Sequence, residues 1–331
     1  MKSHLNFIND LDLRVNTLVI GLVDPLIDPG AIAQAINAAI GLLDSVTVAE
    51  FDSDPLYDYR AQRPVVTYVD GIIAELYEPG MSLDLVTDVQ GERFLHIHGA
   101  EPDFHWPSLV ADVLDIIERF GVERIYTYHG MPAPVAHTQP ADMLIRTTQH
   151  VDNPSIVHGQ VTHPASLSDV FEYEAGKAGK KVTNIRVRVP LYMSRSDMPF
   201  FSGAIAGVRQ LAQLGGPTIP VGDLEQHEDV QAVELKRIQS TDSEFAQLVE
   251  RFENDAKNSS SGFVQPDNST IEIPSTEEIG EALEKFFSSQ NLEQPKPATS
   301  KPKETVTPDR RSQFIAGLSR MFNRKSNEED K

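Results

Sequence analysis

Four histidines form two pairs whose spacing could support metal binding or acid–base catalysis. His96 and His98 stand two residues apart in FLHIHGAEPDFHW, and His129 and His137 lie at either side of a proline-containing stretch, HGMPAPVAH. Alternate residues of a β-strand point to the same face, so His96 and His98 could converge on one ligand. With His129 they offer three donor groups and an open position, which is the arrangement of a catalytic zinc ion.

The alternative for these histidines is a structural role, in which each imidazole hydrogen-bonds to nearby groups. The chain lacks the close helical His-x-x-x-His pair of many zinc enzymes. It also has no cysteine, which excludes disulfides, thiolate nucleophiles and cysteine-based zinc sites. We therefore predict no metal ion and no cofactor, and we favour the structural role.

The residues after His98 are rich in acids and turn formers. Glu101 and Asp103 follow at once, and Trp106 stands between two prolines at the start of an expected helix. Functional loops lie at strand ends in α/β folds, so Glu101, Asp103 and His129 are candidates for one pocket. The other interpretation is an anchoring turn for that helix.

A second polar stretch, DYRAQRP, places Asp58 close to Arg60 and Arg63. Loop-fixing hydrogen bonds or a protein interface explain these three residues better than catalysis does. The sequence contains no G-x-S-x-G nucleophile elbow, no phosphate-binding P-loop and no G-x-G-x-x-G fingerprint. The motifs of three large enzyme classes are thus absent.

The net charge of −20 bears on the choice of partner. Residues 254–331 hold 11 Lys and Arg against 13 Asp and Glu, so nearly all of the negative charge belongs to residues 1–253. Nucleic-acid binding depends on clustered basic residues, so we predict no nucleic-acid partner. The N-terminus lacks the basic start of a signal peptide, and no apolar run approaches the roughly 20 residues of a membrane span, so we expect a cytoplasmic protein.

The hydrophobic pattern predicts an α/β fold, a layered mixed sheet flanked by helices, over residues 1–253. A continuous apolar run at 17–23, a helix that begins after Asp28 and an alternating run at 45–51 predict a β-α-β unit with a parallel pair. Asp70-Gly71 and Gln90-Gly91 predict hairpin turns and hence an antiparallel middle of the sheet. Strands and helices then alternate as far as residue 253.

Residues 254–331 read as a largely disordered tail with two short amphipathic helix candidates. Ser275 and Glu278 form a capping box ahead of the first. The second, RRSQFIAGLSRMFNRK, has an apolar face among five basic residues and is expected to contact an anionic membrane or an acidic protein surface.

Four stretches, DPLYDYRAQRPVV, HGAEPDFHW, ERIYTYHGMPAPVAHTQP and VRVPLYMS, together resemble the proteasome-assembly-chaperone family, in particular its actinobacterial branch of uncharacterised proteins. The resemblance spans roughly residues 15–253. It implies a fold similar to that of purine nucleoside phosphorylases and related hydrolases, self-association, and a role in assembling or capping the proteasome core. Family members that dock on proteasomes use a C-terminal hydrophobic-Tyr-any-residue tail, whereas this chain ends NEEDK, so docking by that route is not expected.

Two functions follow from these observations. We favour a non-enzymatic, homo-oligomeric assembly chaperone or protein-binding module, with proteasome subunits or another protein as partner. The alternative is a hydrolase or phosphorylase-like enzyme that uses Glu101, Asp103 and His129 as acid, base and orienting groups.

Overall fold

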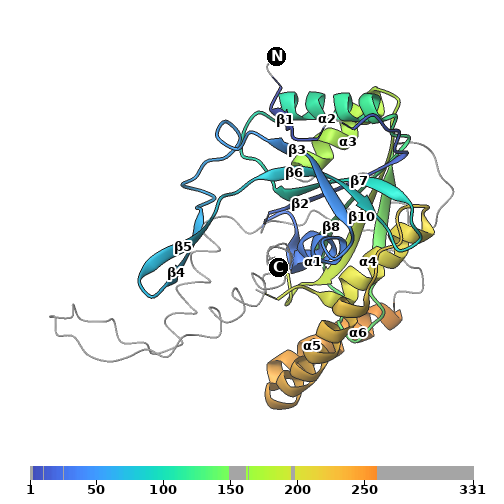
Figure 1. Cartoon of the computed structure of the whole chain (residues 1–331). Helices are drawn as coiled ribbons and strands as arrows, with labels where there is room; N and C mark the ends of the chain where they lie inside the picture. Colours follow the sequence, from blue (N-terminus) through green and yellow to red (C-terminus); the bar gives the residue numbers. More distant parts are fainter. Residues whose placement is uncertain are drawn as a thin grey trace. The chain divides into compact units, whose positions relative to one another are not determined.

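An eight-stranded mixed sheet lies at the centre of the fold, and helices cover both of its faces (Figure 1). The computed structural model describes residues 3–9, 11–24, 26–148, 162, 164–194 and 198–258. The strands of the sheet run in the order β1-β3-β6-β7-β2-β8-β10-β9. Their bounds are β1 Leu5–Phe7, β2 Thr17–Val23, β3 Ser45–Phe51, β6 Met81–Thr87, β7 Arg93–Ala100, β8 Arg124–Ala133, β9 Met143–Thr147 and β10 Lys181–Pro190.

Two apolar cores, one on each face, hold the helices to the sheet. Helices α2 (Trp106–Phe120) and α3 (Leu167–Lys177) cover one face, and α1 (Ile32–Ile40) and α4 (Phe201–Gln213) cover the other. Alternate residues of each central strand enter opposite cores, as Leu95 and Phe94 of β7 do. Helices α5 (Gly222–Thr241) and α6 (Ser243–Asn258) extend the fold beyond α4. The predicted layered α/β architecture is confirmed.

The predicted parallel pairing of residues 17–23 with residues 45–51 is wrong. Strand β2 lies between β7 and β8 and is parallel to both, whereas β3 pairs antiparallel with β1 and β6. The burial of the two strands explains the difference. Strand β2 is buried at all but its last residue, because helices cover both faces of the sheet there. Strand β3 is partly exposed to solvent, as is usual in antiparallel sheets.

Both predicted hairpin turns are confirmed, but only one lies in the main sheet. Gly91, with φ of 83°, closes the turn between β6 and β7. Asp70 and Gly71, both at positive φ, close the turn between β4 (Val65–Val69) and β5 (Ile72–Tyr77), as a type I′ turn requires. These two strands form a separate two-stranded sheet that projects from the main body (Figure 1). We call residues 65–77 the arm.

Asp28 ties the start of α1 to β8. Its buried carboxylate accepts hydrogen bonds from the N–H groups of Ala33 at 2.8 Å and Gln34 at 3.4 Å, and from the N–H of Gly130 at 2.8 Å. Asp28 thus caps α1 across a short 3-10 turn, Pro29–Ala31, rather than from the residue next to the helix. Burial raises the pKa of Asp28 to about 7, against the effect of these hydrogen bonds.

Gly130 allows the close approach that this tie needs. A Cβ atom at position 130 would lie 1.8 Å from the carbonyl oxygen of Pro29. Only glycine therefore fits between β8 and the turn before α1.

The remaining predictions concern membrane spans and the tail. None of the helices in the described ranges is both long and apolar enough to cross a membrane. Helix α6 continues to Asn258, five residues past the predicted end of the globular part. The two helix candidates of the tail lie outside the described residues.

Candidate functional site

His96 belongs to a buried hydrogen-bond network under α1. Its Nε2 atom lies 3.2 Å from Asn37 Oδ1 and 3.3 Å from the Tyr128 hydroxyl group, which itself donates to Asn37 Oδ1 at 2.7 Å. The Asn37 amide donates to the carbonyl oxygen of Gly21 at 2.8 Å. Burial, together with nearby His98, holds the pKa of His96 well below its usual value, so the ring is neutral. The network joins α1 to strands β2, β7 and β8.

His98 stacks on His96 and reaches towards solvent. The two ring centroids are 4.7 Å apart, and His98 Nε2 lies 2.9 Å from Asp84 Oδ2 of neighbouring strand β6. The side chain of His98 is 34% exposed. Both histidines thus have protein partners, in agreement with the structural interpretation.

His129 lies on the opposite face of the sheet, beneath α3. It shares that face with Ile125, which packs in the core of α2 and α3, whereas Tyr128 packs in the core of α1 and α4. His129 is fully buried, and neither ring nitrogen has a hydrogen-bond partner within the described part of the chain. Burial and the charges of Arg186 and Arg146 lower its pKa to about 3, against the opposing effect of Asp169.

The arginines beside His129 belong to an ion-pair network that anchors α3. Asp169 of α3 accepts hydrogen bonds from Arg146 of β9 and, at 2.5 Å, from Arg186 of β10. Arg146 also donates to Glu172 at 2.6 Å. Asp169 further closes a capping box with Ser166 at the start of the helix. The two arginine charges are therefore taken up by carboxylates of α3.

Glu101 lies at the same end of α3 as this network. Its carboxylate accepts a hydrogen bond from the N–H of Leu167, and its own N–H donates to Val23 O at the end of β2. Glu101 is only 7% exposed, and burial raises its pKa to about 7; the Leu167 hydrogen bond opposes this shift, while Asp24 and Asp169 add to it. Asp169 and Arg186 act electrostatically on both Glu101 and His129.

The four histidines consequently do not share one site. His96 and His98 face α1, His129 faces α3, and the combination of these three as metal ligands is wrong because the sheet separates them. Among the described residues, no group of three His, Asp or Glu side chains is placed to hold a metal ion.

Asp103 and Asp58 join two loops. Asp103 Oδ2 accepts from the Asp58 N–H at 2.8 Å and from Gln62 Nε2 at 3.3 Å, and Gln62 also donates to the carbonyl oxygen of Glu101. Trp106 donates its indole N–H to Pro102 O at 2.7 Å, at the start of α2. These contacts match the anchoring-turn interpretation, and the Asp103 carboxylate is engaged by the loop.

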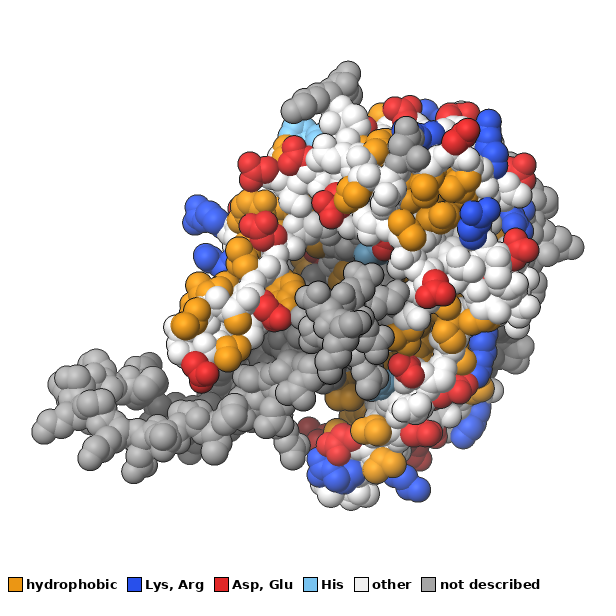
Figure 2. Space-filling model, viewed as in Figure 1, with side chains coloured by type: hydrophobic (Ala, Val, Ile, Leu, Met, Phe, Trp, Pro, Cys, Tyr) orange, Lys and Arg blue, Asp and Glu red, His pale blue; other side chains and the backbone are white. Residues whose placement is uncertain are grey.

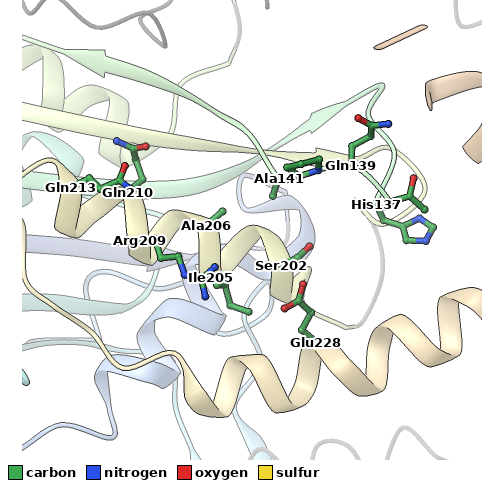
Figure 3. A pocket seen from close by; sticks show the side chains of 12 residues that line it. His137, Gln139, Ala141, Ser202, Ile205, Ala206, Arg209, Gln210, Gln213 and Glu228 are labelled. Atoms are coloured by element: carbon green, nitrogen blue, oxygen red, sulfur yellow. The ribbon is translucent and has the colours of Figure 1, made fainter. Parts of the chain in front are cut away.

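His137 lies apart, in the loop after β8, where it packs against helix α6. Its N–H and its Nδ1 atom both lie 2.7 Å from the Tyr192 hydroxyl group, and its ring stacks on Phe245. It borders a groove of about 530 Å³ formed by residues 137–141 opposite α4, which contributes Ser202 and Arg209 (Figure 3). The groove is polar, and its arginine is already paired with Glu225.

The arm carries a dense set of exposed apolar side chains. Figure 2 shows hydrophobic side chains along it, at the left of the molecule. Consecutive residues of both strands are exposed, so both faces of the arm are apolar. The large exposed apolar residues are Val65 52%, Val66 39%, Tyr68 61%, Val69 56%, Ile72 71%, Ile73 55%, Leu76 56% and Tyr77 41%.

Arg60 and Arg63 lie in the loop that leads into the arm. Both are exposed, and within the described ranges neither guanidinium group makes a hydrogen bond or an ion pair. The arm, which also carries Asp70 and Glu75, and these two arginines together form an apolar surface with charges of both signs around it.

Sequence reasoning missed several residues of the buried networks. Ser166 and Asp169 have the spacing of a capping box, so the start of helix α3 could have been predicted from the sequence. The pattern NIRVRVP, with polar residues alternating on a strand, could have indicated a buried polar face for Asn184 and Arg186. Asn37 and Tyr128 gave no such signal, because their partners come from distant segments.

Glu101 gives a prediction on pH dependence. Its raised pKa means that the folded state holds the Glu101 proton more tightly than the unfolded state does. The contribution of Glu101 to the free energy of unfolding is therefore fully present at low pH and is lost as the pH rises towards 7 and above. Glu101→Gln cannot ionise and keeps an acceptor for the Leu167 N–H. Between pH 5 and pH 7, wild type should lose about 2 kcal/mol of unfolding free energy relative to this variant.

Urea unfolding at several pH values measures this difference. Glu118→Gln is the control, since that side chain is 71% exposed and its substitution should give no comparable trend. A wild-type curve parallel to that of Glu101→Gln would contradict the raised pKa.

A protein family and several solved structures are similar to this chain. A family model described as the PAC2 family matches residues 22–239. No curated protein matches the chain. A protein of unknown function from Corynebacterium glutamicum has a similar structure, with a TM-score of 0.71, 24% identity, and coverage of 77% of this chain and 97% of that one.

Two Mycobacterium tuberculosis structures are also similar. One, of unknown function, is 28% identical with a TM-score of 0.70 and covers 78% of this chain and 90% of its own. The other is a proteasome-assembly chaperone homologue, 22% identical with a TM-score of 0.62, covering 70% and 99%. Since the family model matches well over half of the residues, the chain belongs to the PAC2 family, the proteasome assembly chaperone family.

Proposed function

We propose that this protein is a non-enzymatic protein-binding module that self-associates through its arm and holds another protein, with proteasome subunits as the first partner to test. The observation that carries this proposal is the arm, with eight large exposed apolar side chains on a hairpin outside the main sheet. An exposed apolar patch of this kind on a folded protein usually marks an interaction surface.

The physics of an isolated hairpin supports a partner for the arm. A two-stranded hairpin is marginally stable in water, and strands β4 and β5 pair only with each other in the described part of the chain. Both faces of the arm carry exposed apolar side chains, so a partner that covers both faces would stabilise it. In a closed symmetric oligomer, the same patch of each subunit can cover that of its neighbour.

Charge supports a second copy of this chain as that neighbour. The globular part carries nearly the whole net charge of −20, so its surface is acidic. Arg60 and Arg63 stand exposed at the base of the arm and would complement such a surface. Family membership supports protein partners in general, and one similar structure is a proteasome-assembly chaperone homologue.

The enzyme alternative has less support. Of its three candidate residues, Asp103 accepts hydrogen bonds from the loop of Asp58 and Gln62. Within the described residues, neither ring nitrogen of His129 is hydrogen-bonded to a hydroxyl group that it could activate as a nucleophile.

Sedimentation equilibrium tests self-association. Wild type at tens of micromolar should give a defined mass above the monomer mass of 36.7 kDa. A variant with Val66, Tyr68, Ile73 and Leu76 all changed to threonine should sediment as a monomer. Threonine retains the strand preference of the hairpin while it removes most of the apolar surface.

The matched control changes Val230 and Val233 to threonine, since these are 68% and 71% exposed on α5 and lie away from the arm. It should keep the wild-type mass. A monomeric wild type, or an arm variant with unchanged mass, would contradict self-association through the arm. Recovery of proteasome subunits with tagged protein from its native cells tests the partner separately.

A further inference from the structure

The groove between helix α4 and residues 137–141, which we call the α4 groove, has no part in self-association through the arm. Its volume of about 530 Å³ is that of a typical ligand-binding site, about 300–1,000 Å³. Contacts outside the groove fix its loop wall, since the His137 N–H donates to the Tyr192 hydroxyl group and Thr138 donates to Glu253 of α6. A site whose walls are already held in place loses little conformational entropy on binding.

The shape of the α4 groove suits an extended ligand. Ser202, Ala206, Gln210 and Gln213 line it, and their spacing of three or four residues places them in one row along α4. Figure 3 shows Ser202 at one end of this row and Gln210 and Gln213 at the other. At 1.5 Å per helical residue the row is about 16 Å long. A polypeptide in an extended conformation spans that length with about five residues.

The side chains along the row suit a polypeptide backbone. The amide groups of Gln210 and Gln213 can each donate and accept hydrogen bonds, as the N–H and C=O groups of an extended chain require. Ala206 in the middle of the row and Ala141 on the opposite wall are small, so a main chain can approach α4 closely there.

Glu228 of α5 gives the α4 groove a negative charge at one end. Figure 3 shows its carboxylate near the Ser202 end of the row. Glu228 is half-buried, and within the described ranges it makes no ion pair. The arginine of the groove, Arg209, donates to Glu225 at 2.7 Å instead. A half-buried carboxylate favours a cationic hydrogen-bond donor, so a lysine or arginine side chain of the ligand belongs at this end.

Other classes of ligand fit the α4 groove less well. An anion would meet the carboxylates of Glu225 and Glu228, and the positive charge of Arg209 is already balanced by Glu225. A compact apolar molecule would cover the amide groups of Gln210 and Gln213 without hydrogen-bonding to them. A small amine would use only the Glu228 end and leave the rest of the row without contacts.

We propose that the α4 groove binds an extended segment of another protein, about five residues long, with a lysine or arginine side chain paired with Glu228. The amide groups of Gln210 and Gln213 hydrogen-bond to the backbone of that segment. The inference rests on the proposed role in holding another protein. It does not depend on self-association, because none of the residues that line the groove belongs to the arm.

Saturation-transfer NMR on the full chain tests this proposal with short peptides. The first probe is a pentapeptide of alanine with lysine at its centre and both ends blocked, and it should bind. Norleucine in place of lysine removes the charge and should weaken binding about fivefold, as expected for a partly exposed ion pair. Glutamate at that place should weaken it about tenfold, because two carboxylates would face each other. Butylamine, which has the ammonium group but no backbone, should also bind about tenfold more weakly than the lysine peptide.

Variants of the groove test the assigned contacts. Glu228→Gln keeps the shape without the charge, so the lysine peptide should bind about fivefold more weakly and the norleucine peptide as before. Asp229→Asn is the matched control, since this exposed neighbour on α5 loses the same charge but does not line the groove. It should keep both affinities. Ala206→Phe fills the middle of the row and should abolish binding of both peptides.

Thermal unfolding establishes that each variant is folded, and Glu228→Gln decides the question if Ala206→Phe is not. The proposal is overturned if the lysine peptide does not bind, if the glutamate peptide binds equally well, or if Glu228→Gln retains the wild-type preference for lysine over norleucine. The threonine variant of the arm should bind the lysine peptide as wild type does. Absence of peptide binding together with an oligomeric mass would contradict the α4 groove alone and leave self-association standing.

Discussion

Gly130→Ala is expected to lower the free energy of unfolding by about 4 kcal/mol. The added methyl carbon would lie 1.8 Å from the carbonyl oxygen of Pro29, and backbone atoms cannot move aside as a flexible side chain can. Strand β8 must therefore shift away from the turn before α1. That shift also breaks the hydrogen bond from the Gly130 N–H to buried Asp28, which leaves a carboxylate with fewer donors.

Chemical denaturation of the full chain measures this loss. Gly222→Ala is the matched control, because a Cβ atom at that position meets nothing within 4 Å and the residue begins helix α5. Alanine there should leave stability unchanged or raise it by up to about 1 kcal/mol. Equal stabilities for the two variants would contradict the close approach of β8 and Pro29.

Asp169→Asn should also destabilise the fold by about 4 kcal/mol, the cost of leaving buried charges without their partner. Burial alone would raise the pKa of Asp169, but the charge of Arg186 and the hydrogen bond from Arg146 hold it well below its usual value. Asparagine has the same shape without the charge, so Arg186 would lose the carboxylate to which it donates, while Arg146 would keep its contact with Glu172. The capping box of α3 is weakened at the same time.

The control for Asp169→Asn is Glu225→Gln, which breaks the exposed ion pair with Arg209. Exposed pairs contribute about 0–1 kcal/mol, so this variant should unfold nearly as wild type does. Guanidinium chloride screens charges, and urea is therefore the denaturant to use. A loss for Asp169→Asn as small as that for Glu225→Gln would show that the network beneath α3 contributes little.

The element types were predictable from the sequence, but the strand order was not. The Asp70-Gly71 and Gln90-Gly91 turns depend on residues next to each other in the chain, and both are confirmed. The partners of β2 and β3 depend on contacts between distant segments, which local periodicity does not encode. The alternation of β3 did contain a hint of antiparallel pairing, since one face of that strand is partly exposed.

The candidate residues show the same limit. Sequence spacing correctly placed His96 and His98 on one face of a strand, because that depends only on the period of the strand. It could not place His129 on the other face, since the orientation of β8 relative to β7 is set by the whole sheet. The sequence predicts the arm as part of the main sheet, because its alternating pattern is that of an ordinary hairpin.

Asp28 engages the free N–H groups at the start of the helix that follows β2. In many α/β proteins the helix that follows a central strand binds a phosphate group at its N-terminus, where free N–H groups and the helix dipole attract anions. Here the carboxylate of Asp28 already accepts from Ala33 and Gln34 at that position. A nucleotide would have to displace a competitor that is covalently part of the same chain. The side chain of Asp28 thus takes, from within the chain itself, the place that an anion would occupy at the start of this helix.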